Sequence, residues 1–173
     1  MSEYYLGSIL LVDDTLENLE VLDEILSEKG YETRSATGGQ MALRAVEADP
    51  PDLILLDIMM PDMDGYEVCT RLKSSSSTWN IPIIFISALN DVIDKVRAFQ
   101  VGGVDYLTKP FQVAEVIARV EVHLENARLQ QMLQERADQM EQASETIEEL
   151  KARVKALESH LRHQGVDPSQ IYR

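Results

Sequence analysis

The segment at residues 50–65 reads PPDLILLDIMMPDMDG and contains an unbroken apolar run at residues 53–56. Such a run between turn residues is typical of a strand that is buried on both faces of a parallel sheet. Asp57 follows at the carboxyl end of this predicted strand, which is where open α/β sheets bind their ligands. An aspartate in this place can also simply cap the following loop or helix.

Four further segments predict strands, and helical patterns lie between them. We expect the other strands at 8–12, 31–35, 83–86 and 104–108, and helices at 16–29, after Gly39, at 66–73, at 91–101 and from Val113 onward. Thr15 is a candidate N-cap of the first helix, and Gly30 ends it. Helical spacing is seen at Leu16, Leu19, Leu22, Ile25, Leu26, Met41, Ala42, Ala45, Val46, Val92, Val96 and Phe99. Such strand–helix alternation indicates a parallel sheet with helices on both faces.

Polar residues follow four of the predicted strands: Asp13 and Asp14 the first, Asp57 the central one, Ser87 the fourth and Lys109 the fifth. In a doubly wound sheet these strand ends converge on one edge. Three neighbouring carboxylates stay ionised only with cations among them, and a hard divalent cation such as Mg²⁺ and the Lys109 ammonium would supply two. Taken singly, each residue also fits a plainer role as a cap, a turn or a solvated surface residue.

The ordered set of these residues resembles the receiver domain of two-component response regulators over residues 8–124. The resemblance rests on Asp13-Asp14, Asp57 with the MMPDMDG loop, Ser87-Ala88, Tyr106 and Lys109-Pro110. It implies an α/β fold with a doubly wound, five-stranded parallel sheet of the flavodoxin-like order 2-1-3-4-5. It also implies a cis peptide bond between Lys109 and Pro110, which proline makes accessible.

The resemblance further implies a role for each site residue. Asp57 would be the phosphoacceptor, and a sensor histidine kinase would supply the phosphoryl group. Mg²⁺ would be held by Asp13 or Asp14, by Asp57 and by the backbone carbonyl of Met59. The residues expected to respond to the phosphoryl group are Ser87 and Lys109, which would contact its oxygens, and Tyr106, the aromatic switch.

Two apolar residues bear on the lifetime of such a phosphoryl group. Met59 and Leu89 stand two residues after Asp57 and Ser87, at places that often carry polar groups in fast-cycling members of the family. Neither side chain can orient a water molecule by hydrogen bonding. We therefore predict slow self-dephosphorylation.

The composition narrows the class of protein. A formal charge of −14 disfavours contact with nucleic acid, which needs basic surface. Cys69 is the single cysteine, so no internal disulfide is possible and a buried thiol in a reducing cytosol is expected. Neither a signal peptide nor a membrane span is evident, which predicts a cytoplasmic protein. The histidines lack partners at metal-binding spacing and are expected to be solvated: His123, His160 and His163.

The segment after the receiver-like region has the spacing of a coiled coil. Alternating steps of three and four residues connect Leu133, Arg136, Met140, Ala143, Ile147, Leu150, Val154, Leu157 and Leu161. β-Branched residues at a with leucine at d favour a parallel two-stranded coiled coil, in which Asn126 could set the register and Arg136 is a defect. We expect a receiver domain at 1–124, a coiled-coil helix at 125–164 that dimerises through 126–161, and a flexible tail at 165–173. The alternative is a single amphipathic helix folded against its own receiver.

Three functions are compatible with this organisation. The first is a non-enzymatic signalling adaptor, in which phosphorylation acts through a coiled coil that dimerises or binds a downstream signalling protein. This interpretation is favoured because no winged-helix, kinase or cyclase signature follows residue 124. The second is the input segment of a larger signalling enzyme such as a cyclase or kinase. The third is a phosphatase with an aspartate nucleophile, but residues 11–15, LVDDT, lack the DxDx[TV] spacing of that class.

Overall fold

The structure is a computed structural model of the chain and describes residues 6–88, 92–165 and 167. The chain divides into two compact units, Met1–Arg128 and Leu129–Arg173, each of which is described by itself. Among the described residues, no helix is long and apolar enough to cross a membrane.

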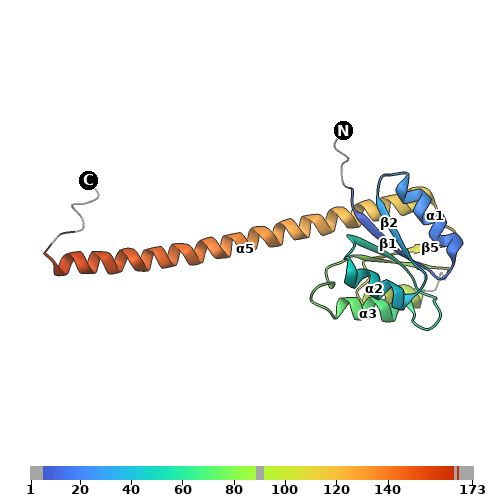
Figure 1. Cartoon of the computed structure of the whole chain (residues 1–173), viewed down its shortest axis with the longest axis horizontal. Coiled ribbons are helices and arrows are strands. Elements are labelled where there is room, and N and C mark those ends of the chain that lie inside the picture. The colour runs from blue at the N-terminus through green and yellow to red at the C-terminus, as the bar shows by residue number, and fades with distance from the viewer. Residues whose placement is uncertain (1–5, 89–91, 166, 168–173) are drawn as a thin grey trace. The chain divides into compact units, whose positions relative to one another are not determined.

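The first unit contains a parallel sheet of five strands (Figure 1). The strands are β1 (Ser8–Val12), β2 (Glu32–Ala36), β3 (Leu53–Asp57), β4 (Ile83–Ser87) and β5 (Asp105–Thr108). The helices are α1 (Leu16–Ser27), α2 (Gly39–Ala48), α3 (Gly65–Lys73), α4 (Val92–Gln100) and α5 (Val113–His163), the last of which continues into the second unit. All strand pairs are parallel and the order is β2-β1-β3-β4-β5, so the predicted flavodoxin-like fold is confirmed.

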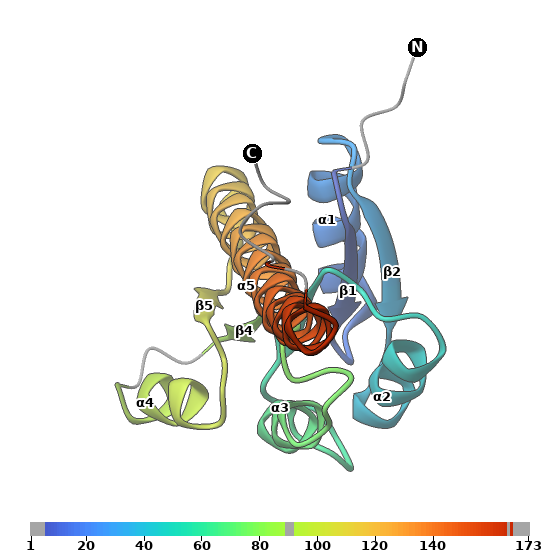
Figure 2. The ribbon, with the colours of Figure 1, turned by 90° about the vertical axis from the view of Figure 1, so that its left-hand side faces the viewer.

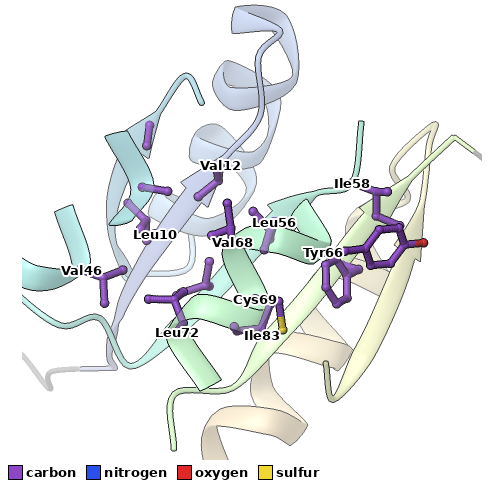
Figure 3. Packing of buried hydrophobic residues seen from close by; sticks show 14 of the residues in the cluster. Leu10, Val12, Val46, Leu56, Ile58, Tyr66, Val68, Cys69, Leu72 and Ile83 are labelled. Carbon is purple, nitrogen blue, oxygen red and sulfur yellow. The ribbon is translucent and has the colours of Figure 1, made fainter. Parts of the chain in front are cut away.

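One face of the sheet is covered by α2, α3 and α4. Alternate strand residues such as Leu10, Leu56 and Phe85 point to this side, because successive side chains in a strand face opposite ways. Figure 3 shows Val68, Cys69 and Leu72 of α3 beside strand residues of this side, among them Leu10, Leu56 and Ile83. Cys69 is fully buried, as predicted, and its thiol donates to the carbonyl of Val101 at 3.4 Å.

The other face is covered by α1 and α5, as Figure 2 shows. The intervening strand residues, for example Ile9 and Leu55, are fully buried here. They pack against an apolar side of each helix, formed by Leu19, Leu22, Ile25 and Leu26 of α1 and by Val116, Val120 and Leu124 of α5. Both faces of the central strand are thus buried, which is why its sequence is a continuous apolar run.

Four residues of the predicted helical patterns are exposed. Leu16 is 60% exposed and Met41 is 54% exposed, and both lie in the first turn of their helices. Val96 and Phe99 of α4 are each 49% exposed, whereas Ala98 is buried and faces the sheet. Helical spacing identifies an apolar side of a helix, but the sheet covers only the part that lies over it.

Helix and strand ends also differ slightly from the predictions. Thr15 occupies the N-cap position of α1, yet its side chain makes no capping hydrogen bond. α1 ends at Ser27 rather than residue 29, and Gly30 follows with a φ of 94°, a left-handed conformation that favours glycine. β2 lies one residue later than predicted, because Tyr31 is still in the turn that leads to it. Leu89 and Asp91 lie outside the described residues.

The second unit consists of the rest of α5, and its apolar side chains are uncovered. Leu133 is 71% exposed, Ile147 and Leu150 are each 52% exposed, and Leu157 is 62% exposed. Pairing of this helix with a second copy stays a prediction, as do the domain boundaries at residues 124 and 164.

Candidate functional site

Three carboxylates meet at the carboxyl edge of the sheet. β1 and β3 are neighbours in register, with Val12 opposite Leu56, so the residues that follow them are brought together. One carboxylate oxygen from each of Asp13, Asp14 and Asp57 lies within 4.8 Å of the others. Asp13 is 0% exposed and Asp57 is 3% exposed, whereas Asp14 is exposed. This donor set suits a hard divalent cation, whose preferred ligands are oxygens.

Lys109 supplies positive charge to this group from the loop after β5. Its ammonium donates to Asp13 Oδ2 at 2.7 Å and to Asp57 Oδ1 at 2.9 Å. Burial lowers the pKa of Lys109, but the hydrogen bonds to these two carboxylates outweigh it, so its pKa is raised overall. The cis peptide bond between Lys109 and Pro110 is present, as predicted. Lys109 therefore stays protonated as the counter-ion of the two buried carboxylates.

The Asp57 carboxyl is held in an environment that disfavours its charge. Its pKa is raised from 3.8 to about 6. Burial is the largest cause, the hydrogen bond from Lys109 opposes the rise, and the neighbouring charge of Asp13 adds to it. An ionised carboxylate that has lost its water and faces another carboxylate is stabilised by any added cation. At neutral pH the Asp57 carboxyl is thus largely ionised and has little solvation.

Asp13 is fixed by a residue that sequence reasoning missed. Asn18, in the first turn of α1, donates from its side-chain amide to both Asp13 oxygens at 3.1 and 3.0 Å. The backbone N–H of Thr15 donates to Asp13 Oδ1 at 2.9 Å. Asp13, rather than the Thr15 side chain, thus accepts hydrogen bonds at the start of α1. The available signal was an amide five residues after the first aspartate, which is weak by itself.

Gly65 allows α3 to begin directly behind Asp57. Its N–H donates to the Ile58 carbonyl at 2.9 Å, and a Cβ at this position would lie 2.3 Å from the Asp57 carbonyl oxygen. Asp64 is the N-cap and accepts from the Glu67 N–H at 2.8 Å. The close approach of the two backbones therefore requires glycine at position 65.

Ser87 lies on β4, the strand next to Asp57, and Tyr106 lies on β5, one strand further away. Ser87 ends β4, is 5% exposed, and its carbonyl accepts from the Lys109 N–H at 2.9 Å. Tyr106 is half-buried in β5, with its ring 6.3 Å from Phe99 and the Lys95 ammonium 4.2 Å above it. Tyr106 therefore contacts α4. The side chain of Met59 is 66% exposed beside the acidic group.

A second polar cluster joins β5 to α5 and corrects one prediction. His123 Nε2 lies 3.0 Å from Asp105 Oδ2, and the histidine side chain is only 17% exposed, so the expectation of a solvated His123 was wrong. Arg119 donates to both oxygens of Asp105 at 2.7 and 2.8 Å. Burial alone would raise the pKa of Asp105, but the hydrogen bonds from His123 and Arg119 hold it below its ordinary value.

The sequence of this chain is similar to those of known proteins. Residues 9–121 match the family model of the response regulator receiver domain. A probable cyclic di-GMP phosphodiesterase of Vibrio cholerae is 37% identical over 134 residues, which are 78% of this chain and 30% of that protein. The response regulator PleD of Caulobacter vibrioides is 42% identical over 112 residues, which are 65% of this chain and 25% of that protein.

Solved structures agree with these sequence matches. The signal receiver domain of a signal transduction histidine kinase from Syntrophus aciditrophicus superposes with a TM-score of 0.65 at 38% identity, over 69% of this chain and 91% of that one. The chain spans about a quarter to a half of the length of the curated relatives it matches.

Proposed function

Because this chain belongs to the response regulator receiver domain family, whose members accept phosphoryl groups from sensor histidine kinases, we propose that Asp57 is its phosphoacceptor. The observation that supports this proposal is the pair of contacts from Lys109 to the buried carboxylates Asp13 and Asp57 at one sheet edge. An Asp57 oxygen attacks the phosphorus atom, an aspartyl-phosphate forms, and the bond to the donor histidine nitrogen breaks with its electron pair left on that nitrogen.

The side chains around Asp57 provide positioning and charge. The Lys109 ammonium, already within hydrogen-bonding distance of Asp57, would neutralise phosphoryl oxygens, and the Ser87 hydroxyl would donate to one of them. The donor set for Mg²⁺ would be Asp13, Asp14, Asp57 and the Met59 carbonyl. When bound, the cation supplies the positive charge that offsets repulsion between the carboxylates and the incoming group.

The phosphorylated state would act through β5 and α5. Movement of Ser87 toward the phosphoryl group would bias Tyr106, which contacts Phe99 and Lys95 of α4. The same ring lies 5.6 Å from the Arg119 guanidinium of α5. A shift there would reach residues 126–161, the predicted parallel dimer contact, and through it a downstream signalling protein. We expect a non-enzymatic phosphoprotein with slow self-dephosphorylation, since Met59 is apolar and exposed beside the site.

A second candidate is the input module of a larger signalling enzyme. It is favoured by the match to the Vibrio cholerae protein, which extends over 134 residues and so reaches beyond the receiver match at 9–121. In that case the helix after the receiver would transmit the state of Asp57 to an output domain. Detection of this sequence within a longer native polypeptide would favour this candidate over the adaptor.

The decisive experiment is phosphorylation by acetyl phosphate with Mg²⁺, followed by intact mass. We expect one phosphoryl group on the wild type and on Asp49→Ala, a control at an exposed aspartate away from the site. We expect none on Asp57→Ala and none on the wild type with EDTA. Labelling of Asp57→Ala equal to that of the control would overturn the assignment.

A further inference from the structure

The helix of the second unit carries an apolar stripe, formed by Leu133, Met140, Ile147, Leu150, Val154, Leu157 and Leu161. Most of these side chains are 45% to 74% exposed. Over several heptads, residues spaced by alternating threes and fours stay in line only when the helix coils around a partner, because a straight α-helix drifts by about 20° per heptad. The stripe is therefore shaped for a second helix.

The stripe is uneven along its length. Its distal half, residues 147–161, has an apolar residue at every contact position: Ile147, Leu150, Val154, Leu157 and Leu161. Its proximal half, residues 126–143, has Asn126, Arg136 and Ala143 at contact positions. Pairing the proximal half would bring two Arg136 side chains together, at a cost in desolvation and repulsion. The distal half is thus the stronger contact.

Charged residues beside the stripe indicate which helix packs on it. The positions that flank the proximal half are uncharged, at Gln130, Met132, Ala137, Gln139, Ser144 and Thr146. The flanking positions of the distal half carry Lys151, Arg153, Glu158, five residues after Arg153, and His160. With Leu133 at position a of the heptad, Arg153 stands at g and Glu158 at e. In a parallel, in-register pair of identical helices, each g residue faces the e residue that lies five positions later in the other helix. Arg153 of each copy would then meet Glu158 of the other, twice by symmetry.

We propose that a second copy of this chain binds parallel and in register along the distal half whether or not Asp57 is phosphorylated, whereas the proximal half pairs weakly. We further propose that phosphorylation changes the pairing of the proximal half, because its weak contacts can rearrange at little cost. This second step rests on the proposed function. The first does not.

The first test reverses the flanking charges in the full chain. By sedimentation, Arg153→Glu and Glu158→Arg should each weaken the dimer about tenfold, because each places like charges opposite one another twice. The double variant should recover the affinity of the wild type. Lys155→Glu, outside the flanking positions, is the control and should change little. All three substitutions retain good helix formers. Failure of the double variant to recover, or an equal effect of the control, would overturn the parallel pairing.

The second test uses disulfide formation at contact positions, since the native Cys69 is fully buried. Val154→Cys should cross-link two copies equally fast with and without acetyl phosphate. Leu133→Cys should cross-link more slowly, and its rate should change with acetyl phosphate unless Asp57→Ala is also present. Arg136→Leu should tighten the dimer at least about tenfold, because it buries an apolar side chain in place of a charge.

These outcomes separate the two proposals. Absence of the Val154→Cys cross-link would overturn dimerisation through the distal half, even if Asp57 is phosphorylated. Phosphorylation of Asp57 with an unchanged rate at Leu133→Cys would overturn only the response of the proximal half. If Asp57 takes up no phosphoryl group but Val154→Cys cross-links, the dimer contact stands and the proposed function fails.

Discussion

The two parts of α5 carry similar apolar side chains in very different surroundings. In the first unit Val116 and Val120 are 0% exposed and Leu124 is 2% exposed against the sheet. In the second unit Leu133 and Ile147 are 71% and 52% exposed. The first unit ends at Arg128, whose guanidinium donates to the carbonyl of Leu6.

The two parts of α5 differ in the spacing of their apolar residues and in the structure that covers these residues. The buried residues of the first part lie four apart over little more than two turns, so they stay on the side that the sheet covers. Those of the second part alternate between steps of three and four, which suits a helix that coils around another. An apolar helix face is therefore either the core of its own domain or the contact of another chain, and the following predictions test that distinction.

The largest expected effect comes from placing a charge in each part. Val120→Asp should destabilise the receiver unit by about 4 kcal/mol or more, because an unpaired carboxylate would be buried. The matched variant Leu150→Asp should leave receiver stability unchanged and weaken dimerisation. Hydrogen exchange of the β3 amides reports the first quantity and sedimentation the second. Similar losses of receiver stability in both variants would contradict the comparison.

A smaller change in stability, of opposite sign, is expected at Asp57, the proposed phosphoacceptor. The raised pKa of Asp57, about 6 against 3.8, means that the folded state binds its proton more tightly than the unfolded state does. Wild-type stability should therefore fall, relative to that of Asp57→Asn, as pH rises from about 4 to about 6, and then stay lower. Without Mg²⁺ at pH 7 the variant should be more stable by about 1 to 3 kcal/mol. Urea unfolding at several pH values measures this, and dimerisation through the distal half should not respond.

Removing an arginine should lower the stability of the receiver only when that arginine lies in the buried part of α5. Arg119→Ala should destabilise the receiver by about 1 to 2 kcal/mol, because the half-buried Asp105 loses a bidentate partner. Arg136→Ala, in the exposed part, is the control and should leave receiver stability unchanged. Because the pKa of Asp105 is lowered in the folded state, its contribution is complete above its ordinary value and is lost as pH falls through the lowered one. Arg119→Ala should thus lose less stability than the wild type on acidification.

The smallest effect concerns a surface ion pair of the second unit. Lys151 lies 2.8 Å from Glu148, and both side chains are about two-thirds exposed, at 67% and 70%. Lys151→Ala should change the thermal stability of the dimer by only about 0.3 kcal/mol, and salt should reduce the difference further. A loss above 1 kcal/mol would mean that Lys151 is covered by the partner helix.

Much of the fold could be predicted from the sequence because the strands are continuous apolar runs. The gathering of Asp13, Asp57 and Lys109 was predictable as well, since parallel strands end at a common edge. The hydrogen-bond partners of individual side chains were harder to predict. The amide of Asn18 and the pairing of His123 with Asp105 depend on where a helix crosses a strand, and spacing along the chain does not contain that information. For the same reason helical spacing alone could not predict that Leu16 and Met41 are exposed.

Gly65 has a consequence for how freely this sequence can vary. A Cβ there would meet the Asp57 carbonyl oxygen at 2.3 Å, whereas one at Gly38 would have no neighbour within 4 Å. In a saturation library sorted for folded protein, nearly every substitution should disappear at position 65 and most should survive at position 38. The same steric constraint should act on natural sequences, so Gly65, behind the proposed acceptor Asp57, should be replaced less often than Gly38.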